Sequence, residues 1–172
     1  RCGHRPNKEI VSSDEMCDRM KAARDAISDD DFMLMARTDA FAKEGLERTI
    51  ERAEKYIEAG ANALFPEAIT SLKDYKALSE KISVPILANI TEFGMTPLFS
   101  KTELKNAGVS IILHPLSAFR AMSKAALEVY SSISQDGSVE KILEKMQSRD
   151  ELYEILEYNT YEKKIEDLFS KE

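Results

Sequence analysis

Cysteines are scarce in this sequence, and long apolar runs are absent. Cys2 and Cys17 are the only two cysteines among 172 residues, which is too few for a disulfide framework and leaves both thiols for packing or chemistry. No segment approaches the run of about 18 apolar residues that a transmembrane helix needs, and residues 1–5 contain no apolar core of a signal peptide. The sequence therefore predicts a cytoplasmic protein.

Clusters of positive charge are also lacking. The 24 Lys and Arg residues are interspersed among 31 Asp and Glu residues, which gives a formal net charge of -7. Proteins that bind nucleic acids gather cations on one surface, so this pattern argues against a nucleic-acid partner and favours a small molecule or a protein. The length, with 43% hydrophobic and 32% charged residues, is typical of one globular domain, which we place at residues 1–172.

Four short apolar runs predict strands that are buried on both faces, as in parallel sheets. They are residues 32–36, 63–65, 84–90 and 109–113. Between them, apolar residues three and four apart predict helices over residues 16–27, 46–57 and 72–82. Ser12 and Glu15 have the spacing of a capping box, and Gly60 and Gly108 stand where helices end before a strand. The short connections favour βα units.

After residue 116 the pattern is helical throughout, so we divide the domain into βα units over residues 1–116 and a helical tail over residues 117–172. Four parallel strands with crossover helices fit either a small doubly wound sheet or half of an eight-stranded barrel. The pattern alone does not choose between them. Because the sequence opens with Arg1 in a loop-like stretch, we expect further residues upstream.

Polar residues follow each predicted strand, where barrel enzymes carry their functional groups. They are Arg37, Thr38 and Asp39 after the first run, Glu67 after the second, Asn89, Thr91 and Glu92 after the third, and His114 and Ser117 after the fourth. Carboxylate, amide and hydroxyl groups at equivalent heights on neighbouring strands suit the binding of a polyfunctional acid. A guanidinium at the end of a buried strand, as at Arg37, needs a carboxylate from the protein or from a ligand.

The opening segment, Cys2-Gly3-His4-Arg5, places a thiol beside an imidazole and near several cations. Such surroundings favour the thiolate form of a cysteine. A thiol of this kind is suited to exchanging a proton or attacking an electrophile.

Each of these candidates also has a structural interpretation. A cysteine near a chain end needs no chemical role, Arg37 can simply pair with Asp39, and polar residues after strands can cap helices. By periodicity alone, Arg120 and Arg149 are solvated surface residues of the helical tail.

Five segments, in order along the chain, carry a family resemblance. They are Cys2-Gly3-His4-Arg5-Pro6, Met35-Ala36-Arg37-Thr38-Asp39-Ala40, Leu64-Phe65-Pro66-Glu67-Ala68-Ile69, Leu87-Ala88-Asn89-Ile90-Thr91-Glu92-Phe93-Gly94 and Pro115-Leu116-Ser117-Ala118-Phe119-Arg120-Ala121. These segments, together with residues 146–149 and 152–153, resemble the C-terminal half of the 2-methylisocitrate lyases of the isocitrate lyase/phosphoenolpyruvate mutase superfamily. The resemblance covers essentially the whole chain.

The resemblance implies a (β/α)8 barrel of the TIM type, whose fifth to eighth strands are the four predicted here. It implies a homotetramer in which the helical tail packs on a neighbouring subunit. The implied reaction belongs to the 2-methylcitrate cycle of propionate catabolism and cleaves (2S,3R)-2-methylisocitrate into pyruvate and succinate through enolate-like anions. Mg2+, or alternatively Mn2+, is implied as a Lewis acid, with its ligands upstream of Arg1.

The resemblance also assigns roles to individual residues. Cys2 is implied as the proton donor to the succinate carbanion and as the base in the reverse direction, with His4 tuning or orienting it. The implied substrate contacts are Cys2, Gly3, Arg37, Glu67, Asn89, Thr91, Arg120 and Arg149. Three arginines suit a tricarboxylate. His114 and Met95 differ from the residues that are usual in the family, at the edge of the implied pocket.

Two alternatives stay open. Isocitrate lyases share the Cys-Gly-His motif, and their substrate differs by one methyl group, which is worth only about 1–3 kcal/mol in a pocket. The Arg5-Pro6 pair and residues 89–94 favour the methylated substrate. Phosphonopyruvate-processing relatives lack the cysteine donor. The second alternative is an assembly module without catalysis, and we expect the 172-residue chain alone to be inactive because half a barrel has open sheet edges and lacks its metal site.

Overall fold

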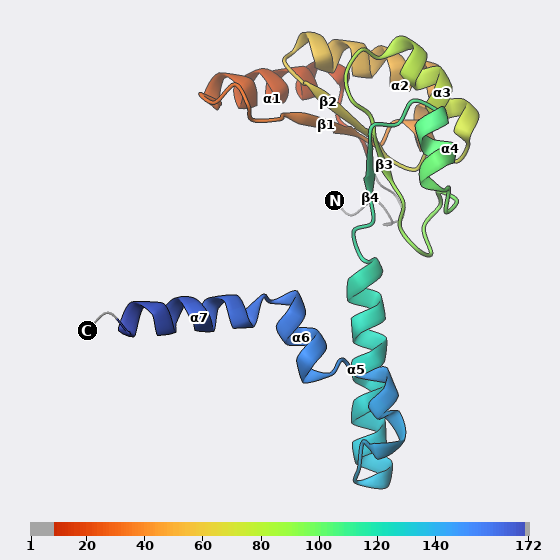
Figure 1. Cartoon of the computed structure of the whole chain (residues 1–172). Coiled ribbons are helices and arrows are strands. Elements are labelled where there is room, and N and C mark those ends of the chain that lie inside the picture. The colour runs from red at the N-terminus through yellow and green to blue at the C-terminus, as the bar shows by residue number, and fades with distance from the viewer. Residues whose placement is uncertain (1–8, 171–172) are drawn as a thin grey trace. The chain divides into compact units, whose positions relative to one another are not determined.

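In the computed structural model, residues 9–170 of the chain are described. They form two compact units that are divided between Ser117 and Ala118, and Figure 1 shows the elements of each unit. In the first unit, helices and strands alternate in the order α1 (Ser13–Ala26), β1 (Met35–Thr38), α2 (Phe41–Glu58), β2 (Ala63–Pro66), α3 (Leu72–Lys81), β3 (Leu87–Asn89), α4 (Lys101–Asn106) and β4 (Ile111–Leu113). The predicted α/β class is therefore confirmed.

The four strands run parallel, and their spatial order follows their order in the chain. β1 pairs with β2 from Met35 opposite Ala63, and β3 pairs with β4 from Leu87 opposite Ile111. A single parallel bridge from β2 to Ile86 joins the two pairs. The carboxyl ends of all four strands therefore lie along the same edge.

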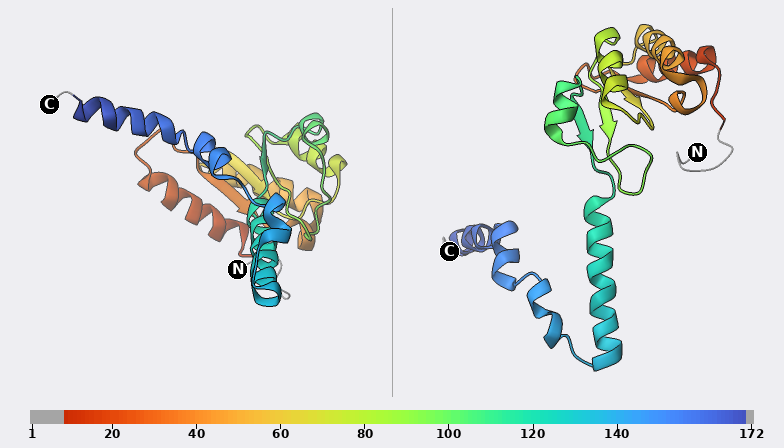
Figure 2. Two further views of the ribbon diagram at one scale, coloured as in Figure 1. Left: turned by 60° about the horizontal axis from the view of Figure 1, so that its bottom comes forward. Right: turned by 90° about the vertical axis from the view of Figure 1, so that its right-hand side faces the viewer.

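Helices cover one face of the strands in the first unit (Figure 1 and Figure 2). The main core joins α2, α3 and α4 to β2 and β3, and its most deeply buried members include Leu64, Tyr75, Leu78, Ala88 and Leu104. A smaller core between α1, β1 and α2 contains Met20, Ala36 and Tyr56. Each fully buried Leu contributes about 1.5–3 kcal/mol relative to exposure. The packing of the helices on this face of the strands therefore provides most of the apolar burial that stabilises the unit.

The opposite face of the strands is less covered by the described residues. Side chains alternate across a strand, so Arg37, Phe65, Asn89 and Leu113 point away from the core to which their neighbours belong. Arg37 is exposed, Phe65 and Asn89 are half-buried, and Leu113 is 37% exposed. The candidate site residues of the strands lie on this second face.

Three of the predicted strands begin later in the chain than the apolar runs. Phe32 and Met33 are exposed, because the amide of Phe32 closes a turn on the carbonyl of Asp29 at 3.1 Å and the chain joins the sheet only afterwards. In the third run, Pro85 has no amide to give to a ladder, and β3 is confined to three residues. β4 starts at Ile111 rather than at residue 109.

Helix ends follow the sequence signals closely. Ser12 is the N-cap of α1 and accepts a hydrogen bond from the backbone of Glu15 at 3.1 Å, whereas the Glu15 carboxylate pairs with Arg19 instead of completing the predicted capping box. Gly60 and Gly108 follow α2 and α4 with φ values of 110° and 83°. Residues that carry a side chain rarely adopt such backbone angles, so glycine is favoured at both turns.

The second unit is helical, as predicted. It contains most of α5 (Ser117–Asp136), the 3-10 helix η1 (Glu140–Lys145), α6 (Arg149–Ile155) and α7 (Tyr158–Phe169). An ion pair of 2.8 Å between Lys145 and Glu128 joins η1 to α5, and the rings of Tyr153 and Tyr158 stack with centroids 4.4 Å apart. Among residues 9–170, no helix combines the length and apolar character that crossing a membrane would require.

Candidate active site

The polar residues predicted at the strand ends meet at the carboxyl edge of the first three strands. Arg37 lies in β1, Asp39 follows it, Glu67 follows β2 and Asn89 ends β3. The backbone brings them together, because parallel strands in register end side by side and the amide of Glu67 donates to the carbonyl of Thr38 at 2.9 Å. Sequence reasoning placed this cluster correctly.

Arg37 is held between two carboxylates. Its Nε and Nη2 atoms donate to Oδ2 and Oδ1 of Asp39, both at 3.0 Å, and Nη2 lies 3.2 Å from Oε2 of Glu67. The guanidinium carbon also lies 4.9 Å from the centre of the Phe65 ring, within range of a cation–π interaction. The expected pair with Asp39 is thus present, and Glu67 adds a second carboxylate.

Asn89 connects Glu67 to the third strand. Its Nδ2 atom donates to Oε2 of Glu67 at 3.4 Å. Its Oδ1 atom is buried and has no hydrogen-bond partner among the described residues. A buried acceptor without a partner costs roughly 1–3 kcal/mol, so this oxygen is suited to accept a hydrogen bond from a ligand hydroxyl.

Tyr75 was predicted only as part of a helical pattern, yet the charge of the cluster affects the pKa of its phenol. Burial raises the pKa of the Tyr75 phenol above its ordinary value, and the negative charge of Glu67 raises that pKa further. The phenol therefore stays protonated and neutral beside the site. A buried aromatic residue at helical spacing gives no sequence signal for this proximity.

The loop after β3 is tied to the start of α5. Thr91 is buried, and the Ser117 hydroxyl donates to Oε1 of Glu92. Phe93 is 92% exposed and has a φ of 63°, which a bulky side chain rarely adopts. His114 is exposed just after β4. These residues form the third and fourth strand ends of the site.

A cavity of about 210 Å3 lies beside the cluster, on the side of β1. It is lined by Glu9, Ile10, Val11, Met16, Arg19, Arg37, Thr38, Asp39, Arg52 and Tyr56. The segment before α1 and the last residues of β1 therefore share one hollow.

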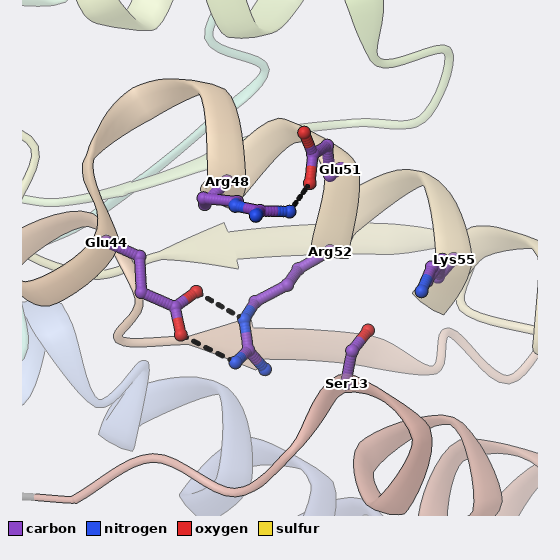
Figure 3. Close-up of a pocket in the computed structure, with 6 residues that line it drawn as sticks. All are labelled: Ser13, Glu44, Arg48, Glu51, Arg52 and Lys55. Carbon is purple, nitrogen blue, oxygen red and sulfur yellow. Dashed lines mark hydrogen bonds and ion pairs between the residues drawn. The ribbon is translucent and has the colours of Figure 1, made fainter.

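A larger hollow of about 440 Å3 lies between the start of α1 and one side of α2, and Figure 3 shows the residues that line it. Its charged residues are paired: Glu44 with Arg52 at 2.6 Å, Arg48 with Glu51 at 2.6 Å and Lys55 with Asp14 at 4.0 Å. The candidate site residues do not line it. Nearby, the half-buried Cys17 thiol donates to the carbonyl of Lys55 at 3.6 Å, which gives this cysteine a packing role.

The remaining candidates are placed only in part. Cys2, Gly3 and His4 lie outside the described residues. Arg120 lies in α5 and Arg149 is the first residue of α6, both in the second unit, so their proximity to Arg37 stays a prediction. Among residues 9–170, no group of three or more His, Cys, Asp or Glu side chains could hold a metal ion.

Comparison with known proteins gives consistent matches. Residues 3–134 match the family described as phosphoenolpyruvate phosphomutase. Over 171 residues the chain is 57% identical to a 2-methylisocitrate lyase of Escherichia coli (strain K12), covering 99% of this chain and 58% of that protein. A solved 2,3-dimethylmalate lyase, described as a member of the PEP mutase/isocitrate lyase superfamily, has a TM-score of 0.79 at 30% identity and covers 95% of this chain and 55% of its own.

A second solved structure, an oxaloacetate acetylhydrolase in complex with the inhibitor 3,3-difluorooxalacetate, has a TM-score of 0.78 at 28% identity and covers 94% of this chain and 55% of its own. The chain thus spans a little more than half the length of the proteins that it matches.

Proposed function

The chain belongs to the phosphoenolpyruvate phosphomutase family, as the resemblance of its segments predicted, and from this premise we propose that it forms part of a lyase that cleaves 2-methylisocitrate into pyruvate and succinate. The observation that carries the proposal is the 57% identity to the Escherichia coli 2-methylisocitrate lyase over 99% of this chain. Because that match covers 58% of the relative, the proposed activity is that of a completed barrel.

The proposed barrel explains why the strands have one covered and one open face. A doubly wound sheet carries helices on both faces, whereas the described helices of the first unit pack on one. Parallel strands are normally buried on both faces, and here the second face exposes Arg37 and Leu113. Four further strands would turn this face into a barrel interior, with the polar cluster at its carboxyl end.

Substrate binding is proposed to use the cluster at that end. Arg37, oriented by Asp39 and Glu67, would face a substrate carboxylate, since guanidinium and carboxylate groups match in geometry. The buried Oδ1 of Asn89 would accept a hydrogen bond from the substrate hydroxyl. Glu67, Thr91, Arg120 and Arg149 complete the proposed contacts. Because Asp39 and Glu67 already offset the charge of Arg37, Arg120 and Arg149 supply most of the positive charge that a tricarboxylate requires.

The proton chemistry is assigned to the opening segment. When the carbon–carbon bond breaks, the substrate hydroxyl gives up its proton to a base and its oxygen becomes the carbonyl oxygen of pyruvate, while the electron pair of the broken bond remains on the succinate fragment. We assign the Cys2 thiol as the group that protonates that carbon. The resulting thiolate is the base in the reverse direction. Gly3 and His4 are proposed to contact the substrate and to orient the thiol, respectively.

Mg2+ would supply Lewis-acid stabilisation of the forming enolate when bound. The described residues do not provide a ligand set for it. We propose that its ligands lie upstream of Arg1, in the part of the barrel that this chain does not contain.

The second unit is proposed to mediate assembly into a homotetramer. Its helices expose many apolar side chains, among them Phe119, Met122, Leu127, Ile155, Leu168 and Phe169. Exposed apolar surface of this extent typically marks a protein interface. A second copy of the chain is the proposed partner, because symmetric homo-oligomers are the commonest assemblies.

The test is a product assay on the enzyme with its barrel complete, preceded by an intact-mass measurement of the sample. With Mg2+ and 2-methylisocitrate we expect pyruvate and succinate, and with isocitrate much slower release of glyoxylate. Preference for isocitrate would support an isocitrate lyase instead, and turnover of neither substrate by a completed barrel would contradict the proposal. The 172-residue chain alone is expected to be inactive.

Replacing the proposed proton donor is the sharpest single-residue test. In the completed enzyme, Cys2→Ser should nearly abolish turnover while binding survives, because a hydroxyl is a much poorer proton donor and base than a thiol. General acid–base groups typically contribute on the order of 10²–10⁴-fold in rate. Cys17→Ser is the matched control. A Cys2→Ser enzyme with the parent kcat would remove the assigned role.

A further inference from the structure

Arg52 is a largely buried cation in α2, with a side chain that is 13% exposed. Its Nε and Nη2 atoms donate to Oε2 and Oε1 of Glu44 at 2.6 and 2.7 Å, as Figure 3 shows. In a continuous helix, residues eight apart lie roughly 12 Å apart along the axis. Gly45, with φ 78° and ψ -178°, breaks the helix between them, and this break permits the pair.

The same guanidinium also reaches the segment that precedes α1. Its Nη1 atom donates to the carbonyl of Val11 at 3.0 Å and to the hydroxyl of Tyr56 at 3.2 Å. Val11 directly precedes the N-cap Ser12. Because Glu44 fixes the plane of the guanidinium, the position of the Val11 carbonyl is fixed as well.

This segment borders the candidate active site. Residues 9–11, Arg52 and Tyr56 line the same cavity as Arg37, Thr38 and Asp39. In the sequence, the segment follows the Cys2-Gly3-His4 motif by only a few residues. A displacement of residues 9–11 would therefore change the cavity wall beside Arg37.

We propose that Arg52 is a positioning residue for the lyase reaction, which fixes residues 9–11 against the cavity of Arg37 and Asp39 by holding the Val11 carbonyl. The inference rests on the proposed function. Arg52 acts through the segment that it holds, so its loss should lower kcat more than it raises KM. Misplacement of reacting groups by about 1 Å can cost on the order of 10²-fold in rate.

The experiment compares Arg52→Lys and Arg52→Ala with Arg48→Ala in the enzyme with its barrel complete. Arg48 lies one turn earlier on α2, pairs with Glu51 and is 68% exposed, which makes it a matched control. Amide hydrogen exchange of Glu15 and Met16, whose amides donate to the hydroxyl and the carbonyl of Ser12, reports the anchoring. The values of kcat and KM for 2-methylisocitrate report its effect on the reaction. Arg52→Lys keeps the charge and guards against misfolding of the alanine variant.

We expect faster exchange of the Glu15 and Met16 amides in both Arg52 variants, and a fall in kcat on the order of 10²-fold for Arg52→Ala and smaller for Arg52→Lys. Arg48→Ala should match the parent in both measurements. Unchanged exchange, or faster exchange with the parent kcat, would overturn the inference. An unsubstituted enzyme without turnover would instead contradict the proposed function, and the inference would fall with it.

Discussion

Arg37 has a defined orientation before any substrate arrives. Its Nε and Nη2 atoms donate hydrogen bonds to Asp39, and Nη2 also contacts the carboxylate of Glu67. Each hydrogen bond to a charged group contributes about 1.5–3 kcal/mol. The orientation of the guanidinium thus depends on Asp39 and Glu67, so the affinity for substrate should depend on these two carboxylates too.

Asp39→Ala should therefore weaken substrate binding through Arg37. In the completed enzyme we expect KM for 2-methylisocitrate to rise by about tenfold, with a smaller change in kcat, since Glu67 still contacts the guanidinium. Steady-state kinetics would measure both values. Asp136→Ala, which removes an exposed ion pair with Lys141, is the control and should change neither. A KM equal to that of the parent would show that Glu67 alone orients Arg37.

Gly108 combines an unusual backbone angle with a close approach. Its φ is 83°, and a Cβ placed there would lie 2.2 Å from the Ser79 hydroxyl oxygen. We expect Gly108→Ala to lower the free energy of unfolding by about 1–3 kcal/mol, measured by denaturant unfolding. In a Ser79→Gly background the steric part of this loss should disappear and the part due to φ should remain. A loss that is equal in both backgrounds would show that Ser79 moves aside freely.

At the scale of elements, α2 depends on an ion pair that spans its break. The hydrogen bond from Arg52 lowers the pKa of the Glu44 carboxyl below its ordinary value. A carboxyl whose pKa is lowered by folding stabilises the fold at a pH above its unfolded pKa, about 4.3. That contribution is lost as the pH falls through the lower pKa of the folded state.

Glu44→Gln should consequently destabilise the protein at pH 7 and have progressively less effect below pH ~4. Urea unfolding of the two proteins across this range would measure the difference. Glu54→Gln, an exposed change on the same helix, is the control for loss of one charge. Curves that stay equally far apart at all pH values would mean that the effect does not come from ionisation of Glu44.

Helices and strands differed in how well the sequence predicted them. Apolar residues at helical spacing located α1, α2 and α3 to within a few residues, because packing against the strands requires that spacing. The start of β1 was predicted too early, since an apolar run cannot reveal that Phe32 is drawn into a turn by Asp29. Gathering of Arg37, Glu67 and Asn89 followed from strand ends meeting at one edge.

Other parts of the site had no signal in the sequence. The contact between Glu44 and Arg52 joins positions that a regular helix would separate, and only the backbone angles of Gly45 reveal it. The Arg52 guanidinium also donates to the backbone carbonyl of Val11. Because every residue has a backbone carbonyl, the sequence gives no signal for this contact. Such contacts depend on the tertiary path of the chain rather than on local pattern.

At the scale of the whole molecule, the helical unit should control assembly. Leu168 on α7 is 64% exposed, and its replacement by Lys should lower the oligomer mass if the unit packs on a second copy. Light scattering coupled to size exclusion would measure the mass, and circular dichroism would confirm unchanged helicity. Asn159→Lys adds the same charge at a polar position of α7 and should leave the mass unchanged. Equal masses for Leu168→Lys and the parent would argue against α7 as the interface.

The agreement between strand order and chain order has a consequence for how the first unit folds. The paired residues Met35 and Ala63 are 28 positions apart, Leu64 and Ile86 are 22 apart, and Leu87 and Ile111 are 24 apart. Every pairing therefore closes a loop of similar, modest length, and closure entropy grows only slowly with length. None of these three pairings among the described strands waits for a distant partner, so the sheet of the first unit can grow one βα unit at a time as the chain emerges during synthesis.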